Sequence, residues 1–249
     1  MTRFAGRSGP ESAVRQALTA VRDPELDEPI TDLGFVTSVT VEAGHAEVRL
    51  RLPTYFCAPN FAYLMVADAR DAVLAVPGIE VAEIVLEEHF AADQINAGVR
   101  AGSFTSAFGD EAGAGELAEL RRNFQRKAHT AALERACQEL IRKGWTVDEL
   151  SRARVDDLAE GERRDSLVRR RSDLGLSRGD RDPIFVDDDG VPIPAEQAPL
   201  RLRFARTVRV SIEGNGHFCR GLLTTRYPES AADQRPESVH LIEIQEARG

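Results

Sequence analysis

Apolar residues recur at helical spacing near the start of the chain. They are Val14, Leu18 and Val21. Gly9 followed by Pro10 is a favourable helix start, because glycine is accepted as an N-cap and proline at the first helical position. The spacing predicts a helix over residues 10–22. Residues 23–29 hold two prolines and four acidic residues, which predict a turn that ends this helix.

The next pattern alternates apolar and charged residues. Val48, Leu50 and Leu52 are separated by charged side chains, which is typical of a strand with one buried face. The predicted elements are a strand at 36–41, a turn at 43–44, a strand at 46–52, a helix at 60–75 and a strand at 79–86. A strand, a helix and another strand in succession predict a right-handed crossover between parallel neighbours. The N-terminal third therefore predicts a compact α/β domain.

Helical spacing returns in the middle of the chain, and runs of branched residues follow it. Residues 91–114 are rich in alanine and glycine and predict a linker that docks through Phe104 and Phe108. Helices are predicted at 116–143, 146–158 and 161–175. From residue 183 onward, branched runs separated by turn signals such as Gly214-Asn215-Gly216 predict an antiparallel sheet. The runs are Phe185-Val186, 200–212, 217–225 and 239–244.

These elements predict an α+β protein of three regions. We expect an α/β domain over residues 1–92, a linker and helical region over 93–182, and an antiparallel β region over 183–249. A chain of 249 residues is long enough for this organisation.

Charge and composition narrow the classes of partner. The formal net charge is −9, which argues against nonspecific binding to nucleic acid or to an anionic membrane, because such binding needs dense positive charge. No apolar run approaches the roughly 20 residues that span a bilayer, and the first ten residues lack the apolar core of a secretory signal. We therefore expect a cytoplasmic protein. Three widely spaced cysteines fit reduced thiols better than disulfides.

One cysteine is predicted to lie where a thiolate is stabilised. Cys57 falls between a predicted strand end and a predicted helix start, where free amide N–H groups and the helix dipole favour an anion. The alternative is a small buried apolar residue, a common fate of free cysteine. Carboxylate oxygens of the acidic residues before the first strand could join the thiolate at an iron ion, but helix capping and solvated turns explain most of these acids equally well; they are Asp23, Glu25, Asp27, Glu28 and Asp32.

A second candidate site lies near the C-terminus. His217 and Cys219 are two residues apart on a predicted strand, so their side chains are expected on the same face, and both suit a transition metal. Two ligands alone are a weak signal, and the neighbouring glycines are also explained by a hairpin turn.

Four short motifs occur in a characteristic order. They are Asp23-Pro24-Glu25, the run Ile-Thr-Asp-Leu-Gly-Phe-Val at 30–36, the run Leu-Pro-Thr-Tyr-Phe-Cys-Ala-Pro at 52–59, and Val76-Pro77-Gly78. Over residues 10–90 the chain resembles the MIP18 family, also called DUF59. The resemblance implies a small α/β domain that builds or delivers iron–sulfur clusters or matures oxygenases.

The resemblance also implies a set of site residues. Cys57 is at the position of the family's motif cysteine, and Asp23, Glu25 and Thr54 match its other polar motif positions. The sequence departs from the family at one point, because Ala58 separates Cys57 from Pro59 where members usually have Cys-Pro.

Three functional hypotheses follow. The leading one is a factor, itself not an enzyme, that assembles or matures an iron–sulfur cluster or metal centre in a client metalloenzyme. Iron or a cluster would bind transiently at Cys57, and an iron-dependent oxygenase is one candidate client. The alternative is a metal-independent adaptor or assembly chaperone that binds such an oxygenase. The third is a metalloenzyme that uses His217 and Cys219. A homodimer is compatible with each.

Overall fold

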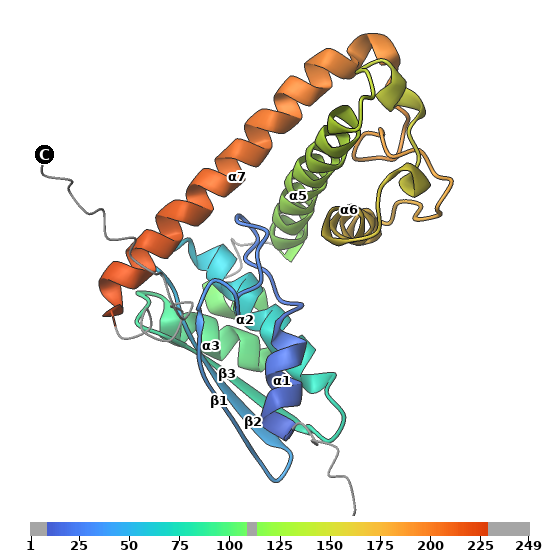
Figure 1. Cartoon of the computed structure of the whole chain (residues 1–249). Coiled ribbons are helices and arrows are strands. Elements are labelled where there is room, and N and C mark those ends of the chain that lie inside the picture. Colours follow the sequence, from blue (N-terminus) through green and yellow to red (C-terminus); the bar gives the residue numbers. More distant parts are fainter. Residues whose placement is uncertain (1–8, 109–113, 229–249) are drawn as a thin grey trace, which may run out of the picture.

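The computed structural model describes residues 9–108 and 114–228 (Figure 1). The N-terminal domain contains helix α1 (Pro10–Leu18), strands β1 (Val36–Glu42) and β2 (His45–Arg51), helix α2 (Pro59–Leu74) and strand β3 (Val81–Glu87). The sheet has the order β1-β2-β3, with β1 antiparallel and β3 parallel to β2. The hairpin and the crossover through α2 are therefore as predicted.

The central strand explains why the domain folds. Ala46, Val48 and Leu50 of β2 are at most 2% exposed, whereas the residues between them carry charge. Val48 pairs with Val39 of β1 and with Ile84 of β3, so a row of branched side chains crosses the sheet. Helix α1 packs against β1 and α2, and α2 packs against β3.

The segment expected to be a linker is largely helical. Helix α3 (Ala92–Ala101) packs on α2 and β3, and the short helix α4 (Phe104–Phe108) follows it. A Cβ added at Gly98 would lie 2.4 Å from the Cβ of Ala107, so glycine permits the close approach of the two helices. Phe104 and Phe108 dock on Tyr63 as expected, with ring centroids 4.9 and 6.3 Å from the Tyr63 ring.

The helical region has its own apolar core. It contains α5 (Ala114–Arg142), the short 3₁₀ helices η1 (Glu149–Arg152) and η2 (Val155–Asp157), and α6 (Glu162–Asp173). The predicted helices at 116–143 and 161–175 correspond to α5 and α6, whereas the one predicted at 146–158 is the pair of 3₁₀ turns. Leu133, Leu140 and Phe185 are fully buried in this second core.

The predicted C-terminal antiparallel sheet is wrong. After the short 3₁₀ helix η3 (Ala195–Gln197), the runs at 200–212 and 217–225 both lie in one long helix, α7 (Ala198–Arg226). Its buried positions recur seven or four residues apart and so share one face; they are Ala198, Ala205, Ile212, Gly216 and Leu223. Val186 pairs with Pro192 in an isolated bridge. The run at 239–244 lies outside the described residues.

The expected turn at Gly214-Asn215-Gly216 is also helical. A Cβ added at Gly216 would lie 3.0 Å from Oε1 of Glu28 and 3.3 Å from Nη1 of Arg220. Helix α7 therefore passes close to the Glu28 side chain of the N-terminal domain at this position, and the atoms that a Cβ would meet are the ends of two flexible side chains.

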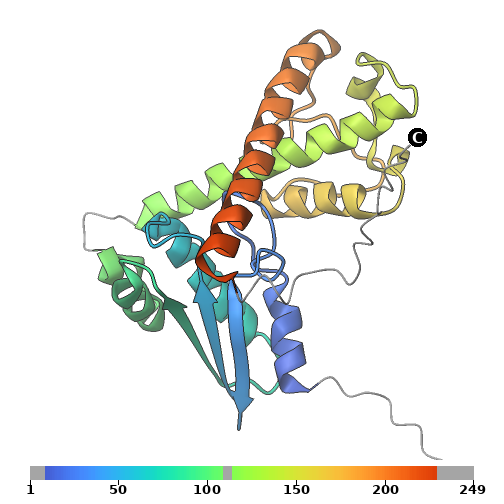
Figure 2. The ribbon, with the colours of Figure 1, turned by 60° about the vertical axis from the view of Figure 1, so that its left-hand side comes forward.

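Helix α7 connects the two parts of the molecule. Its N-terminal half lies beside α5, and its C-terminal end reaches the edge of the sheet where β2 and β3 end (Figures 1 and 2). Leu223 of α7 belongs to the core of the N-terminal domain. No helix of the described chain has the length and apolar character to cross a membrane.

Candidate functional site

Cys57 lies in the loop between β2 and α2. Helix α2 begins directly after its N-cap residue Ala58, so the predicted position at a helix start is correct. The Oγ1 atom of Thr54 is 3.3 Å from the Cys57 sulfur, and the same hydroxyl accepts the N–H of Phe56. The thiol is half-buried and forms no disulfide.

A buried histidine that carries no sequence signal holds this loop. The Nε2 atom of His89 is 2.6 Å from the carbonyl oxygen of Cys57, and its Nδ1 atom accepts the N–H of Ala91 at 3.2 Å. Because a carbonyl oxygen only accepts, Nε2 carries the proton. His89 follows β3, so the ends of two neighbouring strands together fix the position of the cysteine.

Asp23 lies buried in the acidic turn. Its Oδ1 atom accepts the N–H groups of Glu25 and Leu26 at 2.9 and 2.8 Å, which fixes the turn. Burial raises the pKa of Asp23 to about 6, although the two backbone hydrogen bonds oppose the rise. Glu25 is exposed, and its Oε1 atom accepts a hydrogen bond from Asn215 of α7 at 3.2 Å.

Helix α7 brings Cys219 to the same region. Cys219 and Cys57 both pack at the margin of the N-terminal core. Burial raises the pKa of the Cys219 thiol to about 11, and the charges of Asp23, Cys57 and Glu25 add to the rise. Cys219 therefore has these three side chains as electrostatic neighbours. The sequence does not predict that Cys219 packs against the same core as Cys57, because the two residues are distant in the chain.

His217 does not join this group. The strand expected to align His217 with Cys219 is a helix, in which residues two apart are rotated by roughly 200° about the axis. His217 is exposed, whereas Cys219 is half-buried against the core. The geometric basis for a His217–Cys219 metal site is therefore lost.

The site offers an incomplete ligand set. Among residues 9–108 and 114–228, no three His, Cys, Asp or Glu side chains lie close enough together to hold a metal ion. Any metal or cluster edge bound here needs further ligands from outside this set of side chains.

Three exposed aromatic residues lie in the Cys57 loop or beside it. Tyr55, Phe56 and Phe90 are 47%, 78% and 51% exposed. Their ring centroids lie 5.2 to 6.4 Å apart, so they form one aromatic patch. Exposed apolar patches mark surfaces that contact another protein, a ligand or a membrane.

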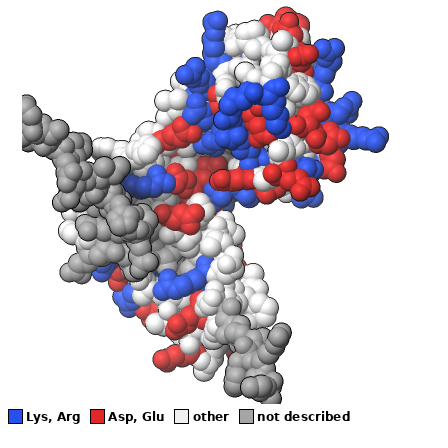
Figure 3. Space-filling view, in the orientation of Figure 1, with Lys and Arg blue, Asp and Glu red and all other residues white. Residues whose placement is uncertain are grey.

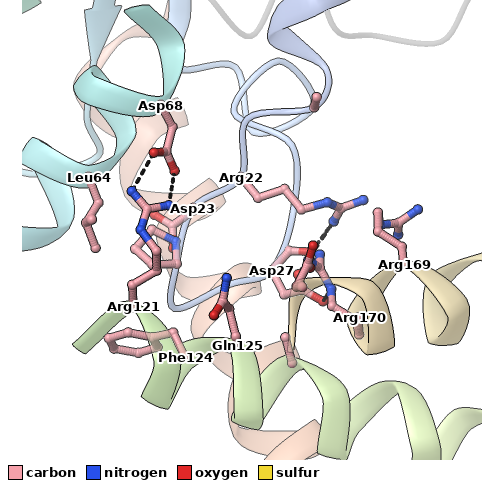
Figure 4. Close-up of a pocket in the computed structure, with 14 residues that line it drawn as sticks. Arg22, Asp23, Asp27, Leu64, Asp68, Arg121, Phe124, Gln125, Arg169 and Arg170 are labelled. Atoms are coloured by element: carbon pink, nitrogen blue, oxygen red, sulfur yellow. Dashed lines mark hydrogen bonds and ion pairs between the residues drawn. The ribbon is translucent and has the colours of Figure 1, made fainter. Parts of the chain in front are cut away.

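A hollow lies where the N-terminal domain meets α5 and α6. It has a volume of about 220 Å³, and paired charges line it (Figure 4). Arg121 Nη1 is 2.7 Å from Asp68 Oδ2, and Arg170 Nε is 3.1 Å from Asp27 Oδ2. Burial raises the pKa of Asp27, while Arg170 opposes the rise. We interpret this hollow as part of the packing interface between the N-terminal domain and helices α5 and α6, because each charge in these pairs has an opposite charge as its partner.

The arginine residues of α6 stabilise the helical region through ion pairs and hydrogen bonds. Figure 3 shows positive and negative side chains interspersed over the helical region. Arg163 and Arg164 pair with Glu139 and Asp180 at 3.7 and 2.7 Å. Arg171 is buried and donates to the carbonyl oxygens of residues 177 and 183.

Comparison with known proteins shows which family the N-terminal domain resembles. Residues 11–86, from α1 almost to the end of β3, match a family model described as "Iron-sulfur cluster assembly protein". The resemblance to the MIP18 (DUF59) family is thereby confirmed for this segment, which contains Asp23 and Cys57. A search of the curated proteins found no match. Cys219 and the whole of α7 lie outside the matched segment.

Proposed function

We propose that this protein is an iron–sulfur cluster assembly factor that holds iron, sulfide or a cluster edge at Cys57 and passes it to a client metalloenzyme. The family match over residues 11–86 supports a role in cluster assembly and carries the proposal. The cysteine stands at the edge of the sheet, partly accessible, in a loop fixed by Thr54 and His89.

The incomplete ligand set suits a transient cargo. A thiolate binds iron tightly, but an ion with few protein ligands keeps positions open for the ligands of a recipient. Thr54 can donate its hydroxyl hydrogen to the thiolate, and His89 keeps the loop in place through the Cys57 carbonyl. Iron or the cluster is here the substrate of a transfer, and this chain positions it.

The aromatic patch of Tyr55, Phe56 and Phe90 is our candidate for the client contact. Apolar contact beside the thiol would place a recipient's ligands next to the cargo and exclude water during transfer. An iron-dependent oxygenase as the client, a homodimer and a cytoplasmic location stay predictions from the sequence.

A metal-independent adaptor is the second candidate function. The exposed patch favours it, because protein contact through these rings needs no metal. The two proposals differ in what the thiol does: an adaptor that lacks the Cys57 sulfur still activates its client, whereas a carrier does not.

Anaerobic reconstitution with iron and sulfide tests the proposal. We expect the wild-type protein to retain both after desalting, Cys57→Ala to lose most of the bound iron, and Cys137→Ala to resemble the wild type. Cys137 is a matched control because it is fully buried in the helical core. Equal and negligible iron in all three proteins would refute the carrier function.

A further inference from the structure

The last residue of α7 contacts the ends of both strands that carry the Cys57 site. Arg226 donates from Nη1 to the carbonyl oxygen of Leu52 at 3.4 Å and from Nη2 to that of Glu88 at 2.9 Å. Leu52 directly follows β2, and Glu88 directly follows β3 (Figure 2). One guanidinium group therefore joins the two strand ends at which the loop of Cys57 and the loop of His89 begin.

Tyr227, the residue after α7, reinforces this contact. Its hydroxyl donates to Oε2 of Glu88 at 2.8 Å. Burial and this hydrogen bond raise the pKa of Tyr227 to about 12, so the hydroxyl keeps the proton that it donates. The guanidinium carbons of Arg51 and Arg226 lie 5.2 and 5.0 Å from the centre of its ring, within the range of a cation–π interaction. Arg51 is the last residue of β2, so the ring also links α7 to that strand.

The two loops that begin at these strand ends are bonded to each other. The N–H of Phe90 donates to the carbonyl oxygen of Tyr55 at 3.2 Å. His89 holds the carbonyl oxygen of Cys57 at 2.6 Å. Because these bonds join the loops, the position of the Cys57 thiol depends on both strand ends.

Apolar packing alone does not account for the contact of Arg226. Leu223 already anchors the same end of α7 in the N-terminal core. A guanidinium group adds directed hydrogen bonds, and here they go to main-chain oxygens at two strand ends. The family match ends at residue 86, so this contact comes from a part of the chain that the family model does not include.

We propose that Arg226 and Tyr227 are positioning residues of the Cys57 site. They hold the ends of β2 and β3 together, so that the loop keeps the thiol beside the aromatic patch. This inference rests on the proposed function and extends it, because it assigns part of the carrier site to the C-terminal region. It requires no side chain of α7 to bind iron.

Alkylation of the full-length protein by iodoacetamide tests the positioning without metal, with mass spectrometry to follow Cys57 separately from the other cysteines. We expect Arg226→Ala to raise the rate constant at Cys57 about tenfold, because two hydrogen bonds from a charged group no longer oppose opening of the loop. Tyr227→Phe loses only the hydrogen bond to Glu88 and should give an increase of about threefold. Arg203→Ala, which removes an exposed arginine of the same helix, should react as the wild type does.

Amide hydrogen exchange shows whether the change is local. In Arg226→Ala we expect the amide of Phe90 to exchange about tenfold faster, whereas that of Val48, in the centre of the sheet, should exchange at the wild-type rate. Arg226→Lys keeps the charge but lacks the planar fork that reaches two carbonyl oxygens, so it should restore the wild-type rates only in part. Equal acceleration at Phe90 and Val48 would indicate a general loss of stability and would overturn the positioning role.

The outcomes separate this inference from the proposed function. If Cys57 reacts at the wild-type rate or more slowly in folded Arg226→Ala, the inference fails, while the carrier function of Cys57 is unaffected. If both rates change as expected but Cys57→Ala retains iron as the wild type does, the positioning stands and the carrier function fails. If circular dichroism shows that Arg226→Ala is unfolded, Tyr227→Phe decides, and a wild-type alkylation rate in that variant overturns the inference.

Discussion

The buried carboxylate of Asp23 makes a quantitative prediction about stability. Its pKa is raised by burial from 3.8 to about 6. Between these values the folded protein binds a proton that the unfolded chain has released, so the free energy of unfolding falls as the pH rises through this window. Above pH 6 the ionised carboxylate costs about 3 kcal/mol relative to its neutral form.

Asp23→Asn removes the charge and keeps the hydrogen bonds. The amide oxygen can accept the same N–H groups of Glu25 and Leu26 that Oδ1 accepts now. We therefore expect the variant to be more stable than the wild type at pH 7.5 by up to about 3 kcal/mol, and the difference to vanish near pH 4.

Urea denaturation followed by circular dichroism at several pH values measures this difference. Asp32→Asn is the matched control, because it removes an exposed acid of the same segment. A variant that is less stable than the wild type at pH 7.5, or one with the same pH dependence, would refute the reasoning. An ionised side chain that lowers the stability of the fold, as Asp23 does at neutral pH, is typical of a residue that is retained for function.

Two further substitutions test the ion pair of Asp27 and the aromatic patch. Arg170→Ala should lower the free energy of unfolding by up to about 3 kcal/mol in urea denaturation, because the Asp27 carboxylate loses this partner and keeps the more distant Arg22 at 3.8 Å. Phe56→Ser should change stability by less than about 0.5 kcal/mol, since the ring is exposed, but should slow cluster transfer to a client in a coupled assay. Unaltered stability or unaltered transfer, respectively, would contradict each expectation.

The N-terminal domain could be predicted from sequence because its local patterns agree with its tertiary fold. The alternation around Val48 and Leu50 marks a strand with one buried face, and that face is buried in the structure. The position of Cys57 before α2 follows from the same strand-to-helix order. Local preference and packing favour the same conformation there.

Helix α7 could not be assigned by the same reasoning. Its branched and aromatic residues favour strands locally, and the glycines at 214 and 216 imitate a hairpin turn. The helix is stabilised by tertiary contacts, through the buried face that includes Ile212 and Leu223. Leu200, Phe204 and Phe218 remain exposed, which blurred the periodicity that would have revealed it.

The full site could not be predicted for a related reason. Cys219 packs against the N-terminal core only because α7 returns to that domain, and no sequence spacing encodes that return. His89 is similarly invisible, since its role depends on the carbonyl of a residue 32 positions away. Motifs identify the residues of one segment, whereas contacts between segments require the fold.

Transfer of a cluster to an acceptor tests the central claim most directly. The reconstituted wild-type protein is mixed anaerobically with a small apo-ferredoxin, and the acceptor's visible circular dichroism is followed with time. We predict that the wild-type protein and Cys137→Ala load the acceptor faster than free iron and sulfide do, and that Cys57→Ala gives only the rate of the free components. Equal rates for Cys57→Ala and the wild type would contradict the account.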